Sequence, residues 1–179
     1  MGIRRVVTGH TPEGKAIVAS DEIVEPVRSP VAPGSELYGL WGGDGAPTFP
    51  DDGSKPPYVT WFPAVGGFRF GLFVVPPAST PAPDLSGVDV EAALATWDAA
   101  VPGLRDHMEP DSPGMHTSDT VDYEYVISGR CVLELDDGVK VELGPGDTVV
   151  QNGTRHAWRN PFDEPCRLVV VLVGAHRQT

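Results

Sequence analysis

The sequence lacks the features that mark secreted, membrane-spanning and nucleic-acid-binding proteins. It has only two cysteines, Cys131 and Cys166, both in apolar strand-like segments, which favours buried free thiols over a disulfide. No run approaches the roughly 18 apolar residues of a membrane-spanning helix, and the first residues contain no apolar signal core. Basic residues are scarce, 13 against 25 acidic ones, and the formal net charge of −12 argues against nucleic acid or an anionic membrane as a partner. We therefore expect a cytoplasmic protein.

Proline and glycine are abundant, with 19 and 21 copies in 179 residues, and they favour many short strands over long helices. They cluster between residues 26 and 57, which predicts an irregular segment lying over a sheet. The length suits a single domain. We expect residues 1–85 to form an N-terminal arm of extra strands and loops, packed on a barrel core at residues 86–179. The Pro-rich, apolar character of the arm favours a homodimer in which the arm augments a sheet or embraces a second subunit.

A single helix is predicted at residues 88–100, where good helix formers follow acidic residues and Pro102-Gly103 supplies a stop. Leu94 and Trp97 share one side of it and are expected to pack on the barrel. Alternating apolar side chains predict a strand around residues 68–72, within an apolar stretch at 58–75. Asp136-Asp137-Gly138 marks a hairpin turn. Further strands are expected at residues 15–20, 36–41, 121–127, 130–135, 139–143, 148–151, 156–159 and 167–173.

Histidines and acidic residues lie in the strand-like region at spacings compatible with one site. Side chains at even separations share a face of a strand. One predicted strand therefore presents a row of polar side chains: His116, Ser118, Thr120, Asp122 and Glu124. His156 and Trp158 share a face of a later strand. If the two faces meet, His116, Asp122 and His156 form a two-histidine, one-carboxylate set that suits one divalent transition metal (Zn, Fe, Ni or Mn) and leaves coordination positions open.

These residues resemble the paired motifs of the cupin superfamily, whose members are small jelly-roll barrels. The first motif is matched by His116, Asp122 and Gly129. The second motif is matched by Gly146, Gly153, His156 and Asn160. The resemblance covers roughly residues 105–175. It implies an all-β, cupin-type jelly-roll β-barrel, to which the arm and the one short helix are additions.

The chain departs from the cupin pattern where the family places its metal ligands. Ser118 stands where the first motif has its second histidine, and Asp122 stands where it usually has glutamate. Three possibilities follow: a three-ligand metal site, a site rebuilt with His107 or Glu124, or no metal at all. No nucleotide cofactor is expected.

The same residues supply candidates for catalysis and for substrate binding. Glu124 and Asp122 are the candidate acid/base groups, because a carboxyl group inside an apolar barrel is costly unless it is paired or protonated. Trp158, Ser118 and Thr120 are the candidate substrate-binding residues that line the site.

Three functions remain open. The first is metal-assisted acid/base chemistry on a small molecule: a dehydratase, isomerase, cyclase or other lyase-like reaction. The second is a non-haem Fe(II) dioxygenase, because two histidines and one carboxylate can hold iron. The third is a non-catalytic barrel that binds a small molecule. Aromatic residues favour a partly apolar ligand: Trp61, Phe68, Phe70 and Trp158.

Overall fold

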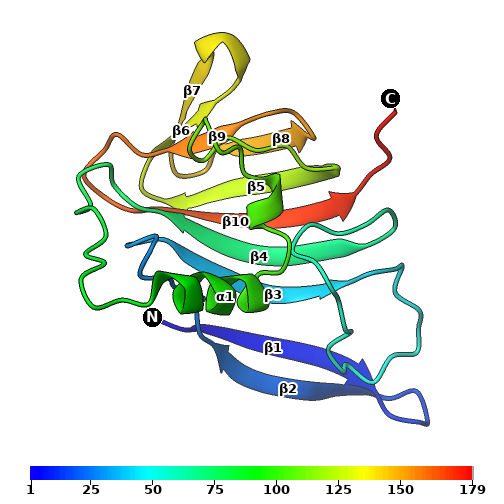
Figure 1. The fold of residues 1–179 in the computed structure, drawn as a ribbon. Coiled ribbons are helices and arrows are strands. Elements are labelled where there is room, and N and C mark those ends of the chain that lie inside the picture. Colours follow the sequence, from blue (N-terminus) through cyan, green and yellow to red (C-terminus); the bar gives the residue numbers. More distant parts are fainter. Residues whose placement is uncertain (179) are drawn as a thin grey trace.

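Strands account for most of the regular structure in the computed structural model, which describes residues 1–178 (Figure 1). In chain order they are β1 (Ile3–His10), β2 (Ala16–Val24), β3 (Glu36–Gly43), β4 (Phe68–Val75), β5 (Thr120–Ser128), β6 (Cys131–Glu134), β7 (Lys140–Leu143), β8 (Thr148–Asn152), β9 (Ala157–Arg159) and β10 (Cys166–Gly174). The helical elements are α1 (Val90–Ala100) and two short 3-10 segments, η1 (Arg105–His107) and η2 (Asp136–Gly138). This agrees with the all-β architecture and the one short helix that the sequence predicts.

The strands form three antiparallel sheets. The largest has five strands in the order β3-β4-β10-β5-β8, so β4 of the N-terminal half is hydrogen-bonded to β10 of the C-terminal half and joins β3 to the sheet. A second sheet has the order β7-β6-β9, and a third consists of the hairpin β1-β2. Because β4 pairs with β10 over eight residues, part of the arm is continuous with the main sheet.

The core lies between the five-stranded and the three-stranded sheet. Val126 and Leu168 from the larger sheet pack with Leu133 and Leu143 from the smaller one, and all four are at least 94% buried. Burial of each such side chain stabilises the fold by about 1.5–3 kcal/mol. Cys131 and Cys166 belong to the same cluster as buried free thiols, as the sequence predicts.

The β1-β2 hairpin packs on the outer side of the N-terminal strands. Ile3 and Val24 contact a buried cluster formed by Tyr38, Leu40, Leu72 and Val74. Arg4 pairs with Asp21 across the hairpin at 2.7 Å. The sequence pattern predicts part of β2 and does not predict β1.

The helix α1 begins where the sequence predicts a helix and carries an N-cap. The Asp89 carboxylate accepts a hydrogen bond from the Ala92 amide at 3.0 Å, which satisfies one of the free N–H groups of the first turn. The helix ends before Pro102-Gly103, where Gly103 has a φ of +77°. Within residues 1–178 no helix has the length and apolar character needed to cross a membrane.

Candidate active site

The side chains of β5 point alternately to the two faces of the sheet, and those on the inner face are polar near the site. Thr120, Asp122 and Glu124 point inward and are at most 5% exposed, whereas Tyr123 and Tyr125 are about half exposed on the other side. This is the arrangement that the two-residue period predicts. Asp122 lies opposite Leu172 of β10 and Gln151 of β8, so both carboxyl-bearing positions sit inside the sheet and not at its edge.

A cavity of about 300 Å³ lies on this inner face. Asp122, Glu124, His116 and His156 contribute its ionisable groups. The arm and the helical segment supply much of the remaining wall, so residues outside the predicted barrel core help to shape the site. The larger hydrophobic and aromatic side chains that line it are Leu37, Trp61, Phe62, Phe73, Val74, Val75, Trp97, Leu104, Met108, Trp158, Val170 and Leu172.

Two histidines form a pair at one wall of the cavity. His116 and His156 exchange backbone hydrogen bonds of 2.9 and 3.0 Å, and their ring centroids lie 4.2 Å apart. Each Nδ1 lies within hydrogen-bonding distance of a carbonyl oxygen, that of Gly114 at 3.1 Å and that of Thr154 at 2.9 Å. A carbonyl can only accept, so each Nδ1 carries the proton and each Nε2 keeps a lone pair. Burial lowers the pKa of both rings, that of His156 to about 4, so both are neutral at pH 7.

The two carboxyl groups differ in protonation because they share a buried site. Burial raises the pKa of Asp122 to about 6, against a lowering effect of the Thr120 hydroxyl. Burial, together with the nearby charge of Asp122, raises the pKa of Glu124 to about 9. At pH 7 Asp122 is mostly ionised and Glu124 is protonated. Within residues 1–178, Asp122 Oδ1 and Glu124 Oε2 are buried without a hydrogen-bond partner.

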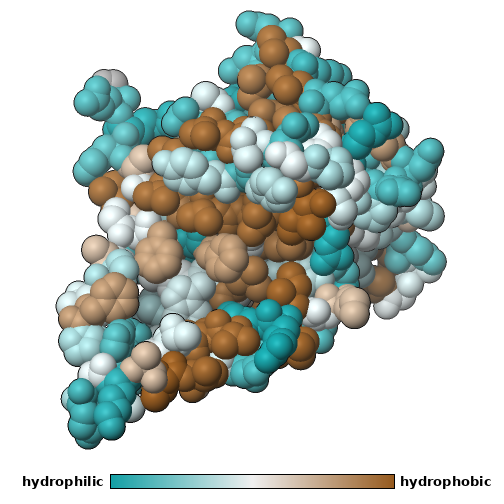
Figure 2. All heavy atoms as spheres, turned by 180° about the vertical axis from the view of Figure 1, so that it is seen from behind, coloured by the Kyte–Doolittle hydropathy of each residue, from teal (hydrophilic) through white to brown (hydrophobic). Residues whose placement is uncertain are grey.

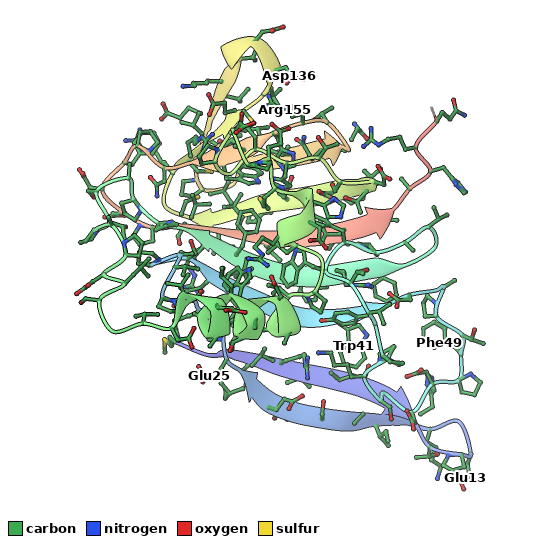
Figure 3. All side chains as sticks on the ribbon, viewed as in Figure 1. Glu13, Glu25, Trp41, Phe49, Asp136 and Arg155 are labelled. Atoms are coloured by element: carbon green, nitrogen blue, oxygen red, sulfur yellow. The ribbon has the colours of Figure 1, made fainter. Side chains whose placement is uncertain are left out.

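Arg155 links the segment that precedes His116 to the segment that carries His156. Its guanidinium donates to both oxygens of Glu109, each at 2.6 Å. It also donates to Asp136 at 2.9 Å (Figure 3). Glu109 lies at the start of the turn that leads to His116, and Arg155 directly precedes His156. Bidentate pairing of this kind fixes geometry as well as distance. Arg155 is therefore a positioning residue for the histidine pair.

The predicted substrate-binding residues occupy different positions. Trp158 lines the cavity, with its ring 6.2 Å from that of His156. Ser118 and Thr120 are almost fully buried next to the site, where their hydroxyls share a hydrogen bond of 2.8 Å, and neither belongs to the lining. Of the aromatic residues expected at a ligand, Trp61 also lines the cavity. Phe70 is 40% exposed on the outer face of the sheet.

Sequence reasoning missed several lining residues. Phe62 lies in a loop, and Leu104 and Met108 flank η1. The paths of these segments depend on tertiary contacts and leave no periodic signal in the sequence. Trp97 was predicted to face the barrel, and it reaches the cavity itself. Phe73 belongs to a predicted strand, but the strand pattern alone does not say which of its faces meets a cavity.

The predicted three-ligand metal set is not assembled in this arrangement. β5 begins at Thr120, and His116 forms isolated bridges with Met108 and His156, so it lies outside β5 although it lines the same cavity. Among residues 1–178 no group of three or more histidine, cysteine, aspartate or glutamate side chains is spaced to hold a metal ion. His107 contacts Phe62 and the Thr117 carbonyl and is not part of the lining. These side chains do not fit a three-ligand site as they lie here, and we assign no chemical step to a metal.

The family model described as "Cupin domain" matches residues 105–172, the segment that carries both histidines and both carboxyl groups. The chain contains a cupin domain at residues 105–172. This confirms the resemblance found in the sequence motifs, and with it the jelly-roll class of the fold. The match begins at η1 and ends within β10, so the cupin domain includes the inward row of β5 and excludes α1 and the first four strands.

Curated relatives of this cupin are fungal proteins. It is 30% identical over 115 residues to the "Cupin-domain-containing oxidoreductase srdB" of Neurospora crassa. The aligned segment covers 61% of this chain and 59% of the relative. It is 47% identical over 49 residues to the "Oryzines biosynthesis cluster protein J" of Aspergillus oryzae, 27% of each chain. Across the curated relatives, the matched segment spans between 24% and 59% of the relative's length.

Solved structures also resemble this chain, at lower identity. The polyketide cyclase RemF from Streptomyces resistomycificus matches 87% of this chain and 82% of its own, with 20% identity and a TM-score of 0.43. A Cupin 2 conserved barrel domain protein from Salinispora arenicola matches 60% of this chain and 64% of its own, with 22% identity and a TM-score of 0.38.

Proposed function

We propose that this cupin is an enzyme that transfers protons on a small organic substrate, with Asp122 as general base and Glu124 as general acid. The observation that carries the proposal is the pair of inward carboxyl groups with pKa values of about 6 and about 9 in one cavity. Two neighbouring titratable groups whose environments separate their pKa values are the usual arrangement of an acid and a base at neutral pH. Their unpartnered oxygens leave both groups available to a ligand.

The chemistry follows from the protonation states. Asp122 accepts a proton from a C–H or O–H group of the substrate, while Glu124 donates one to a carbonyl or a leaving hydroxyl oxygen. The neutral imidazoles of His116 and His156 accept or donate hydrogen bonds without adding charge. Such a pair suits dehydration, isomerisation or cyclisation. The low polarity of the surrounding wall keeps water from competing for the same protons.

Proton exchange on a simple ketone tests this proposal without knowledge of the natural substrate. 1-Tetralone is an uncharged aromatic ketone whose α-protons exchange slowly with D₂O. At about pH 7.5, between the two pKa values, we expect the protein to accelerate this exchange, and Asp122→Asn or Glu124→Gln to reduce the acceleration about 100-fold. Nuclear magnetic resonance follows the loss of the α-proton signal.

Two exposed carboxylates provide matched controls for the exchange experiment. Asp163→Asn and Glu13→Gln make the same chemical changes outside the cavity and are expected to retain the wild-type rate. A wild-type rate equal to that of buffer, with a ketone shown to bind, would contradict the proposal. Full activity in both cavity variants would contradict the assignment of the two roles.

An oxidoreductase is the second candidate. Two curated relatives, 30% and 31% identical over 115 and 91 residues, are named cupin-domain-containing oxidoreductases. Both Nε2 atoms of the histidine pair keep lone pairs that suit Zn, Fe, Ni or Mn. Metal content by inductively coupled plasma mass spectrometry, with His116→Ala as comparison, separates the candidates. About one equivalent of iron that the variant loses, together with oxygen uptake, would favour this candidate over metal-free proton transfer.

A further inference from the structure

The cavity wall contains a row of aromatic rings in successive contact. Phe62, His116, His156, Trp158 and Phe73 follow one another, and the ring centroids of neighbours lie 6.0, 4.2, 6.2 and 5.7 Å apart. These spacings lie in or close to the range of about 4.5–7 Å in which aromatic rings attract one another. We call these five side chains the aromatic row. The members come from four separate stretches of the chain, so the row exists only in the folded protein.

The cavity lining contains acidic groups and no basic lysine or arginine side chain among the described residues. Asp122 and Glu124 are its carboxyl groups. Two arginines adjacent in sequence to lining residues, Arg155 and Arg159, lie outside the lining. Arg155 is engaged with Glu109 and Asp136, and Arg159 with Glu134 and the Pro113 carbonyl. A carboxylate or phosphate that entered would find two acidic groups and no cation, in surroundings where a charge loses its hydration.

We infer that this site takes a planar, uncharged aromatic molecule and rejects carboxylate- and phosphate-bearing ones. The inference rests on the proposed function only in placing the substrate in this cavity. The aromatic row offers ring faces and edges to a flat π-system, while Asp122 and Glu124 offer an acceptor and a donor to its hydroxyl or carbonyl groups. The cavity volume of about 300 Å³ lies at the small end of the range for ligand pockets, which suits a molecule of few fused rings.

Binding of three matched probes tests the inference on the wild-type protein. 2-Naphthol is flat and uncharged, 2-naphthoate is flat and anionic, and decahydro-2-naphthol is uncharged but saturated. Isothermal titration calorimetry at pH 7 is expected to give the lowest Kd for 2-naphthol, with the other two probes at least about tenfold weaker. Equal or tighter binding of 2-naphthoate would overturn the charge argument. Equal or tighter binding of the saturated alcohol would overturn the aromatic argument.

Two variants assign the effects to named side chains. Asp122→Asn removes the charge and is expected to lower the ratio of the 2-naphthoate Kd to the 2-naphthol Kd about tenfold. Phe62→Leu shortens the aromatic row and is expected to weaken 2-naphthol binding several-fold. The matched control is Phe49→Leu, since Phe49 is 72% exposed and lies near the tip of the β1-β2 hairpin, away from the cavity (Figure 3).

The binding and exchange experiments can contradict the substrate class and the proton-transfer proposal separately. If 2-naphthol binds as expected but 1-tetralone exchanges no faster than in buffer, the substrate class stands and the proton-transfer proposal fails. If 2-naphthoate binds at least as tightly as 2-naphthol, the substrate class is wrong whether or not exchange is accelerated.

Discussion

Glu124 is a buried carboxyl group whose pKa of about 9 lies far above its ordinary value of 4.5. The folded protein holds this proton over a pH range in which the unfolded chain has released it. The stability associated with the proton is therefore fully present below about pH 4.5 and is lost as the pH rises through 9. Glu124→Gln cannot ionise, so we expect its free energy of unfolding to rise relative to the wild type between about pH 5 and pH 9, by up to about 1.4 kcal/mol per pH unit.

Urea unfolding of the two proteins across this pH range measures the difference. Glu13→Gln, at an exposed position on the β1-β2 hairpin, is the control, and its difference from the wild type is expected to stay constant. A constant difference for Glu124→Gln as well would mean that Glu124 ionises as a solvated glutamate does, and the acid assigned to the site would be lost with it.

Individual positions on a strand were predictable because one rule governs them. The two-residue period places Asp122 and Glu124 inside and Tyr123 outside once β5 is recognised. The rule applies only within a strand, and β5 begins at Thr120, so it does not set the path of the chain at His116. The period therefore predicts which side chains of β5 face inward, but it does not predict how the histidine pair is placed relative to them.

At the scale of elements, α1 is held loosely over the site. None of its eleven residues is buried, and it lies in front of β3 in Figure 1. Trp97 reaches the cavity, and the Trp61 amide donates to the Pro102 carbonyl at 2.7 Å, which joins the loop before β4 to the end of the helix. An element with little buried surface belongs to the least stable part of a fold.

We expect amide hydrogens of α1 to exchange faster than those of β10 and to become protected when 2-naphthol fills the cavity. The physical reason is that a ligand in contact with Trp97 must be released before the helix can open. Hydrogen-exchange mass spectrometry checks this, with peptides of the β1-β2 hairpin as the control that the ligand leaves unchanged. If the amide hydrogens of α1 are protected as strongly as those of β10 without ligand, α1 is not among the least stable elements and this expectation is wrong.

Helices and strands could be predicted where residues within or next to the element, such as cap, stop and turn residues, determine its position. The cap and stop residues placed α1 within two residues of its start, and the turn residues placed the β6-β7 hairpin. β1 was missed because its burial is mostly partial and its apolar positions are mixed with Arg4 and Arg5, so pairing with β2 and packing by Ile3 decide its conformation. The loop that carries Trp61 and Phe62 has no local signal at all.

At the scale of the whole molecule, the outer face of the five-stranded sheet remains uncovered beyond the β1-β2 hairpin. Seen from behind, the molecule carries a broad hydrophobic region across its middle (Figure 2). The outward positions of four neighbouring strands that contribute exposed apolar or aromatic side chains are Phe70, Val173, Tyr123, Tyr125, Ile127 and Val150. Contiguous patches of this kind mark interaction surfaces.

We expect this face to bind a second copy of the chain. The net charge of −12 makes two copies repel each other in general, whereas the six residues of this face are all uncharged and add nothing to that repulsion. Tyr123 lies at its centre, opposite Val171 on one side and Val150 on the other.

Light scattering after size exclusion is expected to give twice the chain mass of 19.0 kDa for the wild type and a single chain mass for Tyr123→Glu. Val139→Glu changes a similarly exposed side chain between β6 and β7 and is expected to leave the dimer intact, whereas a monomeric wild type would show that this face has another partner or none.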